Sequence, residues 1–129
     1  MLINDVLVSD IRSGNADMTI AKGETVYLSI KIFNKSTEQP YTLKEGEKLI
    51  FGIKKGKSDT NYTIKKQLTS DDEIEGVYPV ILSDTDTNIE EGRYYYDVGI
   101  KTTDDYFVRP FNNRIVYVTN GITYKGDVE

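Results

Sequence analysis

Residues 90–102 read EEGRYYYDVGIKT, and this stretch decides how the chain folds. After Gly92 the side chains alternate with the two-residue period of a β-strand that has one buried face. One face carries Tyr94, Tyr96, Val98 and Ile100, and the opposite face carries Tyr95, Asp97, Gly99 and Lys101. Because the second set is the more polar, we expect the first set to point into the core.

The same stretch has the spacing of a tyrosine corner. In immunoglobulin-like sandwiches, the strand after this corner opens with a tyrosine whose hydroxyl bonds to backbone upstream. Glu90, Gly92, Tyr94 and Tyr96 occur in matching order, and Tyr96 takes the position of the disulfide cysteine in antibody domains. We therefore predict that Tyr94 makes this hydrogen bond and that Gly92 and Tyr96 belong to the structural centre of the same strand.

Alternation with intervening turn signals recurs along the whole chain. One face of residues 24–33 carries Val26, Leu28, Ile30 and Ile32, and one face of residues 47–55 carries Leu49, Phe51 and Ile53. The expected strands are 17–23, 24–33, 47–55, 60–68, 77–83, 94–102, 106–111 and 114–120. Such a series predicts an all-β protein, an immunoglobulin-like antiparallel β-sandwich of about 7–8 strands.

Two segments modify this pattern of alternating strands. Pro79 cannot donate to a ladder, so residues 77–83 should form an edge strand or contain a bulge. Residues 83–92, SDTDTNIEEG, have the caps and acidic first turn that suit one short helical or 3₁₀ turn.

A length of 129 residues favours a single domain over 1–129, with 1–16 as an N-terminal arm and 120–129 as a C-terminal tail.

Composition excludes several classes of function. The chain has no His and no Cys, so the usual general base, thiolate catalysis and soft metal sites are missing. A net charge of -5 argues against nucleic-acid binding, and no apolar run is long enough to span a membrane. The first residues lack the basic region of a signal peptide. We expect a soluble protein made in the cytoplasm, without catalytic residues, cofactor or small-molecule substrate.

Two clusters could bind ligands. Carboxylate and amide oxygens suitable for Ca²⁺ occur at Asp84, Asp86, Asn88, Glu90 and Glu91. Their spacing is not that of an EF-hand, and Asx turns and helix-start hydrogen bonds account for them, so we predict no metal site. A platform for sugar rings could be formed by Tyr95 together with Tyr27, Tyr41 or Tyr106. The alternative function is therefore a carbohydrate-binding module.

Charge is distributed unevenly along the chain. Residues 44–66 contain seven Lys and three acidic residues, whereas residues 71–92 contain eight acidic residues and no base. Segments of opposite sign suit contacts within one molecule or between neighbouring copies, including head-to-tail contacts. The predicted interaction surface consists of Lys54, Lys55, Lys57, Lys65, Lys66, Asp71, Asp72 and Tyr95.

Four stretches occur in the order found in one protein family: IAKGETVYLSIKI, EKLIFGIKK, VILSDTDTNIEEGRYYYDVGI and RIVYVTNGITY. The shared features are a turn at residues 22–24, a loop with Leu82, Ser83 and Thr87, and the core strand from Gly92 to Asp97. Over residues 17–120 the chain resembles the N-terminal domain of phage baseplate upper proteins, from tailed phages and prophages of Gram-positive bacteria.

This resemblance implies a non-enzymatic adaptor of immunoglobulin-like fold. Such domains act in several copies in the virion tail baseplate and join the tail hub to receptor-binding or fibre proteins. The implied partners are other virion tail proteins, with no nucleic acid and no membrane. The implied location is the virion, after synthesis in the host cytoplasm. A bacterial surface or adhesion sandwich is a further alternative, against which the missing secretion signal argues.

Overall fold

The computed structural model describes residues 6–9, 17–34, 37–103 and 107–120. These residues form strands β1 (Val6–Ser9), β2 (Met18–Ala21), β3 (Val26–Asn34), β4 (Lys48–Lys54), β5 (Ile64–Leu68), β6 (Tyr78–Leu82), β7 (Gly92–Lys101) and β8 (Phe107–Thr119). A short 3₁₀ helix, η2 (Ser70–Asp72), follows β5, and no α-helix occurs in the described ranges. The all-β prediction is confirmed. Within the same ranges, no helix has the length and apolar character needed to cross a membrane.

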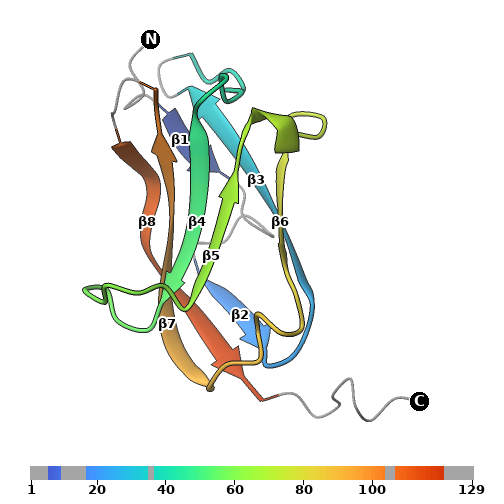
Figure 1. Cartoon of the computed structure of the whole chain (residues 1–129), viewed down its shortest axis with the longest axis vertical. Helices are drawn as coiled ribbons and strands as arrows, with labels where there is room; N and C mark the ends of the chain where they lie inside the picture. Colours follow the sequence, from blue (N-terminus) through green and yellow to red (C-terminus); the bar gives the residue numbers. More distant parts are fainter. Residues whose placement is uncertain (1–5, 10–16, 35–36, 104–106, 121–129) are drawn as a thin grey trace.

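The strands form two sheets (Figure 1). One has three strands in the order β1-β3-β6, and the other has five in the order β2-β8-β7-β4-β5. All neighbouring pairs are antiparallel except β2 and β8, which run parallel with Met18 opposite Val116. The expectation of a purely antiparallel architecture is therefore wrong. No hairpin joins these two strands, so the connection does not force them to run in opposite directions.

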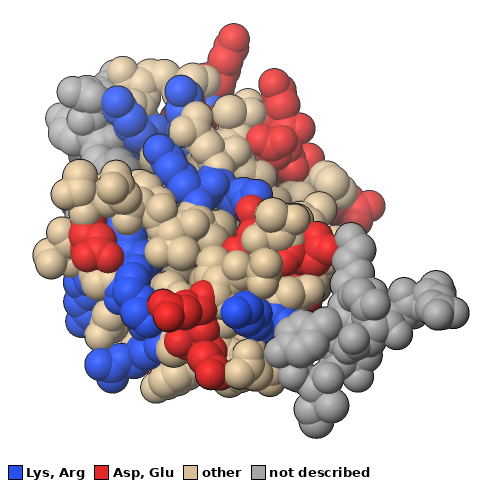
Figure 2. Space-filling view, turned by 60° about the horizontal axis from the view of Figure 1, so that its bottom comes forward, with Lys and Arg blue, Asp and Glu red and all other residues tan. Residues whose placement is uncertain are grey.

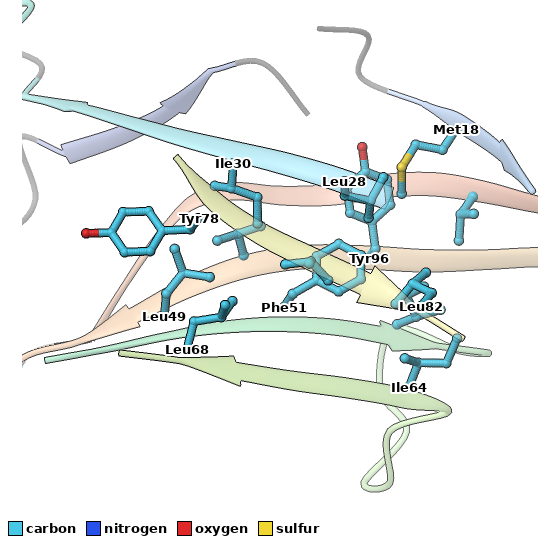
Figure 3. Packing of buried hydrophobic residues seen from close by; sticks show 14 of the residues in the cluster. Met18, Leu28, Ile30, Leu49, Phe51, Ile64, Leu68, Tyr78, Leu82 and Tyr96 are labelled. Carbon is cyan, nitrogen blue, oxygen red and sulfur yellow. The ribbon is translucent and has the colours of Figure 1, made fainter. Parts of the chain in front are cut away.

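Both sheets contribute to one hydrophobic cluster (Figure 3). The side chains assigned to inner faces are buried: Val26, Leu28, Ile30 and Ile32 in β3, Leu49, Phe51 and Ile53 in β4, and Tyr94, Tyr96, Val98 and Ile100 in β7. At the centre, the ring of Phe51 lies 5.9 Å from the ring of Tyr96, centroid to centroid, at a tilt of 37°. Two-residue alternation therefore predicted the core correctly.

Strand β8 differs from the expectation. Residues 106–111 and 114–120 were predicted as separate strands, but Phe107–Thr119 is one strand with two shifts of register against β7. The pairs Tyr96↔Arg114, Val98↔Phe111 and Ile100↔Val108 show that each shift leaves one extra residue in β8. The second shift falls at Pro110. Because proline has no N–H to donate, a β-bulge lets the strand continue past it.

Edge strands and turns also bear on the predictions. β6, which contains Pro79, is an edge strand, as expected. Residues 83–92 contain one short turn, as predicted, in which Thr87 N donates to Ser83 O at 3.1 Å, an i→i+4 hydrogen bond, and the turn does not extend into a helix. A 3₁₀ helix that was not predicted lies at Ser70–Asp72, where Thr69 and Asp72 form a reciprocal capping box.

The predicted termini are only partly described. β1 lies within the segment predicted as an N-terminal arm, and it pairs with β3, with Val8 opposite Ile32. The remainder of residues 1–16 lies outside the described residues. The same holds for residues 121–129 of the predicted C-terminal tail and for Tyr106.

Candidate interaction surface

The residues predicted to form the tyrosine corner meet at the start of β7. Tyr94 is buried, and its hydroxyl donates to the carbonyl oxygen of Glu90 at 2.6 Å. Burial, and then the charge of Glu90, raise the pKa of Tyr94, so the hydroxyl stays protonated and able to donate. Gly92 has φ of 146°, which favours glycine, and a Cβ there would lie 2.7 Å from Lys55 Nζ. These residues have a structural role.

Replacing Tyr94 by phenylalanine should lower the free energy of unfolding by about 1 kcal/mol, the ordinary net worth of one hydrogen bond. Urea denaturation measures the loss. Tyr95→Phe is the matched control, because the Tyr95 hydroxyl makes no hydrogen bond within the described part of the chain. Equal stability of Tyr94→Phe and the unmodified protein would show that the hydroxyl does not hold the corner.

The motifs that carry the family resemblance come together at one end of the fold. The turn at residues 22–24 joins β2 to β3, and the loop with Thr87 joins β6 to β7, so both connections pass between the sheets. Gly23 N donates to Thr87 O at 3.2 Å, and Thr87 Oγ1 donates to Glu24 O at 2.6 Å. Gly23 has φ of 81°, which suits glycine in a turn. The motifs therefore close this end of the molecule.

An ion pair joins the basic and acidic segments of the chain within one molecule. Lys66 Nζ lies 2.8 Å from Asp86 Oδ2, and Asp86 also exchanges hydrogen bonds with Ser83. Burial raises the pKa of Asp86, but the hydrogen bonds from Lys66 and Ser83 outweigh it, and the pKa is lowered. In the described residues, no group of three or more acidic side chains is placed to hold a metal ion.

The lowered pKa of Asp86 predicts a pH-dependent contribution to stability. A carboxyl whose folded-state pKa is depressed stabilises the fold above its unfolded pKa, and the contribution is lost as pH falls through the folded-state value. Asp86→Asn should therefore cost about 0.5–1 kcal/mol at neutral pH, with the difference fading as pH falls below the ordinary value of 3.8.

Urea denaturation at neutral and acid pH measures this effect. Lys66→Gln should show the same fading difference, because it removes the other half of the ion pair. Lys65→Gln is the control, since Lys65 lies on the same strand and makes no ion pair within the described residues. If Asp86→Asn lowered the free energy of unfolding equally at neutral and acid pH, the ion pair with Lys66 would not be the source of the loss.

Four cations and two tyrosines gather on the outer face of the five-stranded sheet. This basic patch consists of Lys54, Lys57, Lys65, Arg93, Tyr62 and Tyr95. Lys55 instead lies over the ring of the inner-face residue Tyr94, at 4.5 Å. The Tyr62 ring has Lys54 Nζ at 4.6 Å and Lys65 Nζ at 5.3 Å. The Tyr95 ring has Lys57 Nζ at 4.9 Å and the Arg93 guanidinium at 5.7 Å. These are the distances of cation–π contacts.

Strand register explains the arrangement of the basic patch. Lys54 lies opposite Tyr95 on β7, and Gly52 lies opposite Lys65 on β5. A Cβ on Gly52 would overlap the ring of Tyr62, so the glycine lets this ring lie against the sheet. Figure 2, which brings this end of the molecule forward, shows Lys and Arg side chains in bands beside separate groups of Asp and Glu.

A second charged surface lies beyond the far end of β5. This acidic tip consists of Asp71, Asp72, Glu73, Ile74 and Glu75. Ile74 and Val77 exchange two backbone hydrogen bonds of 2.8 and 2.9 Å, and Glu75 and Gly76 between them have φ of 51° and 82°. Two successive positive φ values are typical of a type I′ turn. The side chain of Ile74, between Glu73 and Glu75 in the sequence, is 62% exposed.

The predicted interaction surface is therefore two surfaces. The structure brings Lys54, Lys57, Lys65 and Tyr95 together, whereas Lys55 lies over Tyr94 and Lys66 forms an ion pair with Asp86. Asp71 and Asp72 lie at the opposite end of the molecule from the loop after β4 (Figure 1). Sequence reasoning missed Tyr62 and Arg93 as members of the patch. Tyr62 lies between Lys57 and Lys65 in the sequence, and Arg93 shares a strand face with Tyr95, so sequence proximity and alternation could have indicated both.

The aromatic residues considered for a sugar platform do not assemble. Tyr95 lies on the five-stranded sheet under Lys57 and Arg93. Tyr27 is exposed on β3 of the other sheet, and Tyr41 is buried with its hydroxyl donating to Glu47. Stacking on a sugar needs open aromatic faces that lie side by side, and these three tyrosines do not lie side by side.

The described residues define a class of protein: an all-β domain whose surface features are a cationic, aromatic patch and a separate acidic tip. A scan against protein-family models and a search of curated proteins found no match for this chain.

Proposed function

We propose that this chain is an immunoglobulin-like β-sandwich that serves as a non-enzymatic adaptor in the tail baseplate of a phage or prophage. Its role is to join the tail hub to receptor-binding or fibre proteins, in several copies. The two sheets around one shared core support the sandwich assignment. The hydrogen bond from Tyr94 to the carbonyl oxygen of Glu90 supports the immunoglobulin-like assignment.

One observation carries the adaptor proposal: two surfaces of opposite charge lie at opposite ends of a domain with a continuous core. An adaptor must hold two contact surfaces at a constant separation, and a packed core does this because it resists deformation. The resemblance to phage baseplate upper proteins is the reason for proposing a tail baseplate as the location. Its motif residues hold two inter-sheet connections together, with Thr87 Oγ1 donating to Glu24 O.

Particles induced from the source bacterium test the proposal by immunogold electron microscopy. Antibody against the chain should label the distal end of the tail, and antibody absorbed with purified protein serves as the control. The purified chain should also form a stable complex with the tail hub protein in size-exclusion chromatography. Intact tails without label, or label confined to the bacterial surface, would refute the proposal. Binding on a glycan array that Tyr95→Ala abolishes would favour the carbohydrate-binding alternative.

A further inference from the structure

We propose that copies of this chain associate head to tail, with the acidic tip of one copy bound on the basic patch of the next. This inference goes beyond the adaptor proposal and does not rest on it, because it concerns the purified chain alone. It follows from the chemistry of the two surfaces and from their positions in the fold.

The basic patch lacks carboxylate partners. Lys57, Lys65 and Arg93 make no ion pair within the described part of the chain, and their charges lie over tyrosine rings instead. Lys54 donates to a backbone oxygen, that of Asp59, at 2.7 Å. Like charges held close together repel one another, and an acidic surface docked on them relieves this repulsion. The rings also restrict the lysine side chains, which lowers the entropy cost of ordering them on binding.

The acidic tip has matching chemistry. Its four acidic residues flank Ile74 in the sequence, and the side chain of Ile74 is exposed. On the basic patch, the Tyr62 ring is 42% exposed between Lys54 and Lys65. Each surface therefore combines an exposed apolar or aromatic side chain with charges of one sign. Complementary interfaces commonly combine apolar contacts with charges of opposite sign.

The two surfaces cannot meet within one molecule. The tip follows β5 and the loop before β5 carries Lys57, so the whole strand separates them (Figure 1). Its five residues extend the chain by about 17 Å, at about 3.3 Å per residue. The contact must form between copies, and because it joins two different surfaces it is heterologous. Such contacts continue into rings or open chains and do not stop at a dimer.

Analytical ultracentrifugation tests the contact by charge reversal. At low salt, the unmodified chain should sediment as a series of growing species from about 10 µM to about 1 mM, and salt of about 0.5 M should dissolve them. Reversing the patch with Lys57→Glu and Lys65→Glu, or the tip with Asp71→Lys and Glu75→Lys, should each weaken self-association by at least about tenfold. All four side chains are exposed, so thermal unfolding should show that the variants remain folded.

Mixing the two variants gives the decisive result. The patch variant keeps a native tip, and the tip variant keeps a native patch, so an equimolar mixture should regain the association that each variant alone has lost. A chain that carries all four reversals should again associate with itself. Lys31→Glu, on the outer face of β3, is the control for Lys57→Glu, because it makes the same charge change on the other sheet.

Three outcomes would overturn the proposal. The first is an unmodified chain that stays monomeric at low salt, as expected if the patch instead receives a phosphate-rich polymer. The second is self-association that the patch and tip variants leave unchanged. The third is a mixture of the two variants that associates no more than either variant alone. None of these outcomes would affect labelling of the tail, so the adaptor proposal is tested separately.

Discussion

Replacing Phe51 by alanine should lower the free energy of unfolding by about 3–5 kcal/mol. Phe51 is fully buried in β4 and contacts Tyr96 of β7 near the centre of the cluster that both sheets share. The cavity left by its ring could be filled only if the sheets moved closer, and the connections between them oppose this. The loss is a large part of the total stability of an ordinary domain, which is about 5–15 kcal/mol.

Urea denaturation followed by tyrosine fluorescence measures this loss. Ile50→Ala is the matched control, because Ile50 is the preceding residue of β4 and lies half-buried on the outer face. It should cost about 1 kcal/mol, since less apolar surface is removed from contact and no enclosed cavity remains. Phe51→Leu should fall between the two. If Phe51→Ala cost no more than Ile50→Ala, Phe51 would not lie at the centre of the core.

The core could be predicted from the sequence because its signal is local. In residues 24–33 and 94–100, every second side chain is apolar or aromatic, and a strand sends alternate side chains to opposite faces. No knowledge of partner strands is needed to decide which face is buried. The same reasoning placed Pro79 on an edge strand, since a missing N–H is a property of one residue.

Pairing between distant strands could not be predicted in this way. β2 and β8 lie at opposite ends of the chain, and their parallel alignment depends on the whole fold. The bulges in β8 have the same origin, because register shifts become visible only against the partner strand β7.

The 3₁₀ helix, in contrast, could have been predicted from the sequence. Thr69 and Asp72 have the capping-box spacing, as do Ser83 and Asp86, but a short turn was predicted only for the second pair.

The basic patch, too, could be predicted from the sequence only in part. Lys54 and Lys57 are near neighbours in sequence, so their common surface could be expected. Tyr62 and Arg93 join them through the turn after β4 and the pairing of β4 with β7. Asp71 was assigned to the same surface because it is close in sequence, but the intervening strand β5 carries it to the opposite end.

The second large effect is expected at Glu47, a buried carboxylate immediately before strand β4. Replacing Glu47 by alanine should lower the free energy of unfolding by about 2–4 kcal/mol. Its Oε1 accepts hydrogen bonds from Tyr41 Oη at 2.7 Å and from Lys44 N at 2.8 Å. Burial, followed by Glu47 itself, raises the pKa of Tyr41, so this hydroxyl remains a donor. Alanine would leave two donors in or near the core without an acceptor.

The cost at Glu47 should be large because this carboxylate holds the crossing between the sheets. Residues 41–47 pass from β3 to β4, and Leu43 N donates to Tyr78 Oη at 2.7 Å in the same crossing. Glu47→Gln keeps an acceptor oxygen and should lose about half as much, whereas the exposed neighbour change Glu45→Ala should be nearly neutral. In a double-mutant cycle, Tyr41→Phe should recover part of the stability lost in Glu47→Ala, because it removes one of the two donors that would have no acceptor. Strictly additive losses would mean that the two side chains do not stabilise the crossing together.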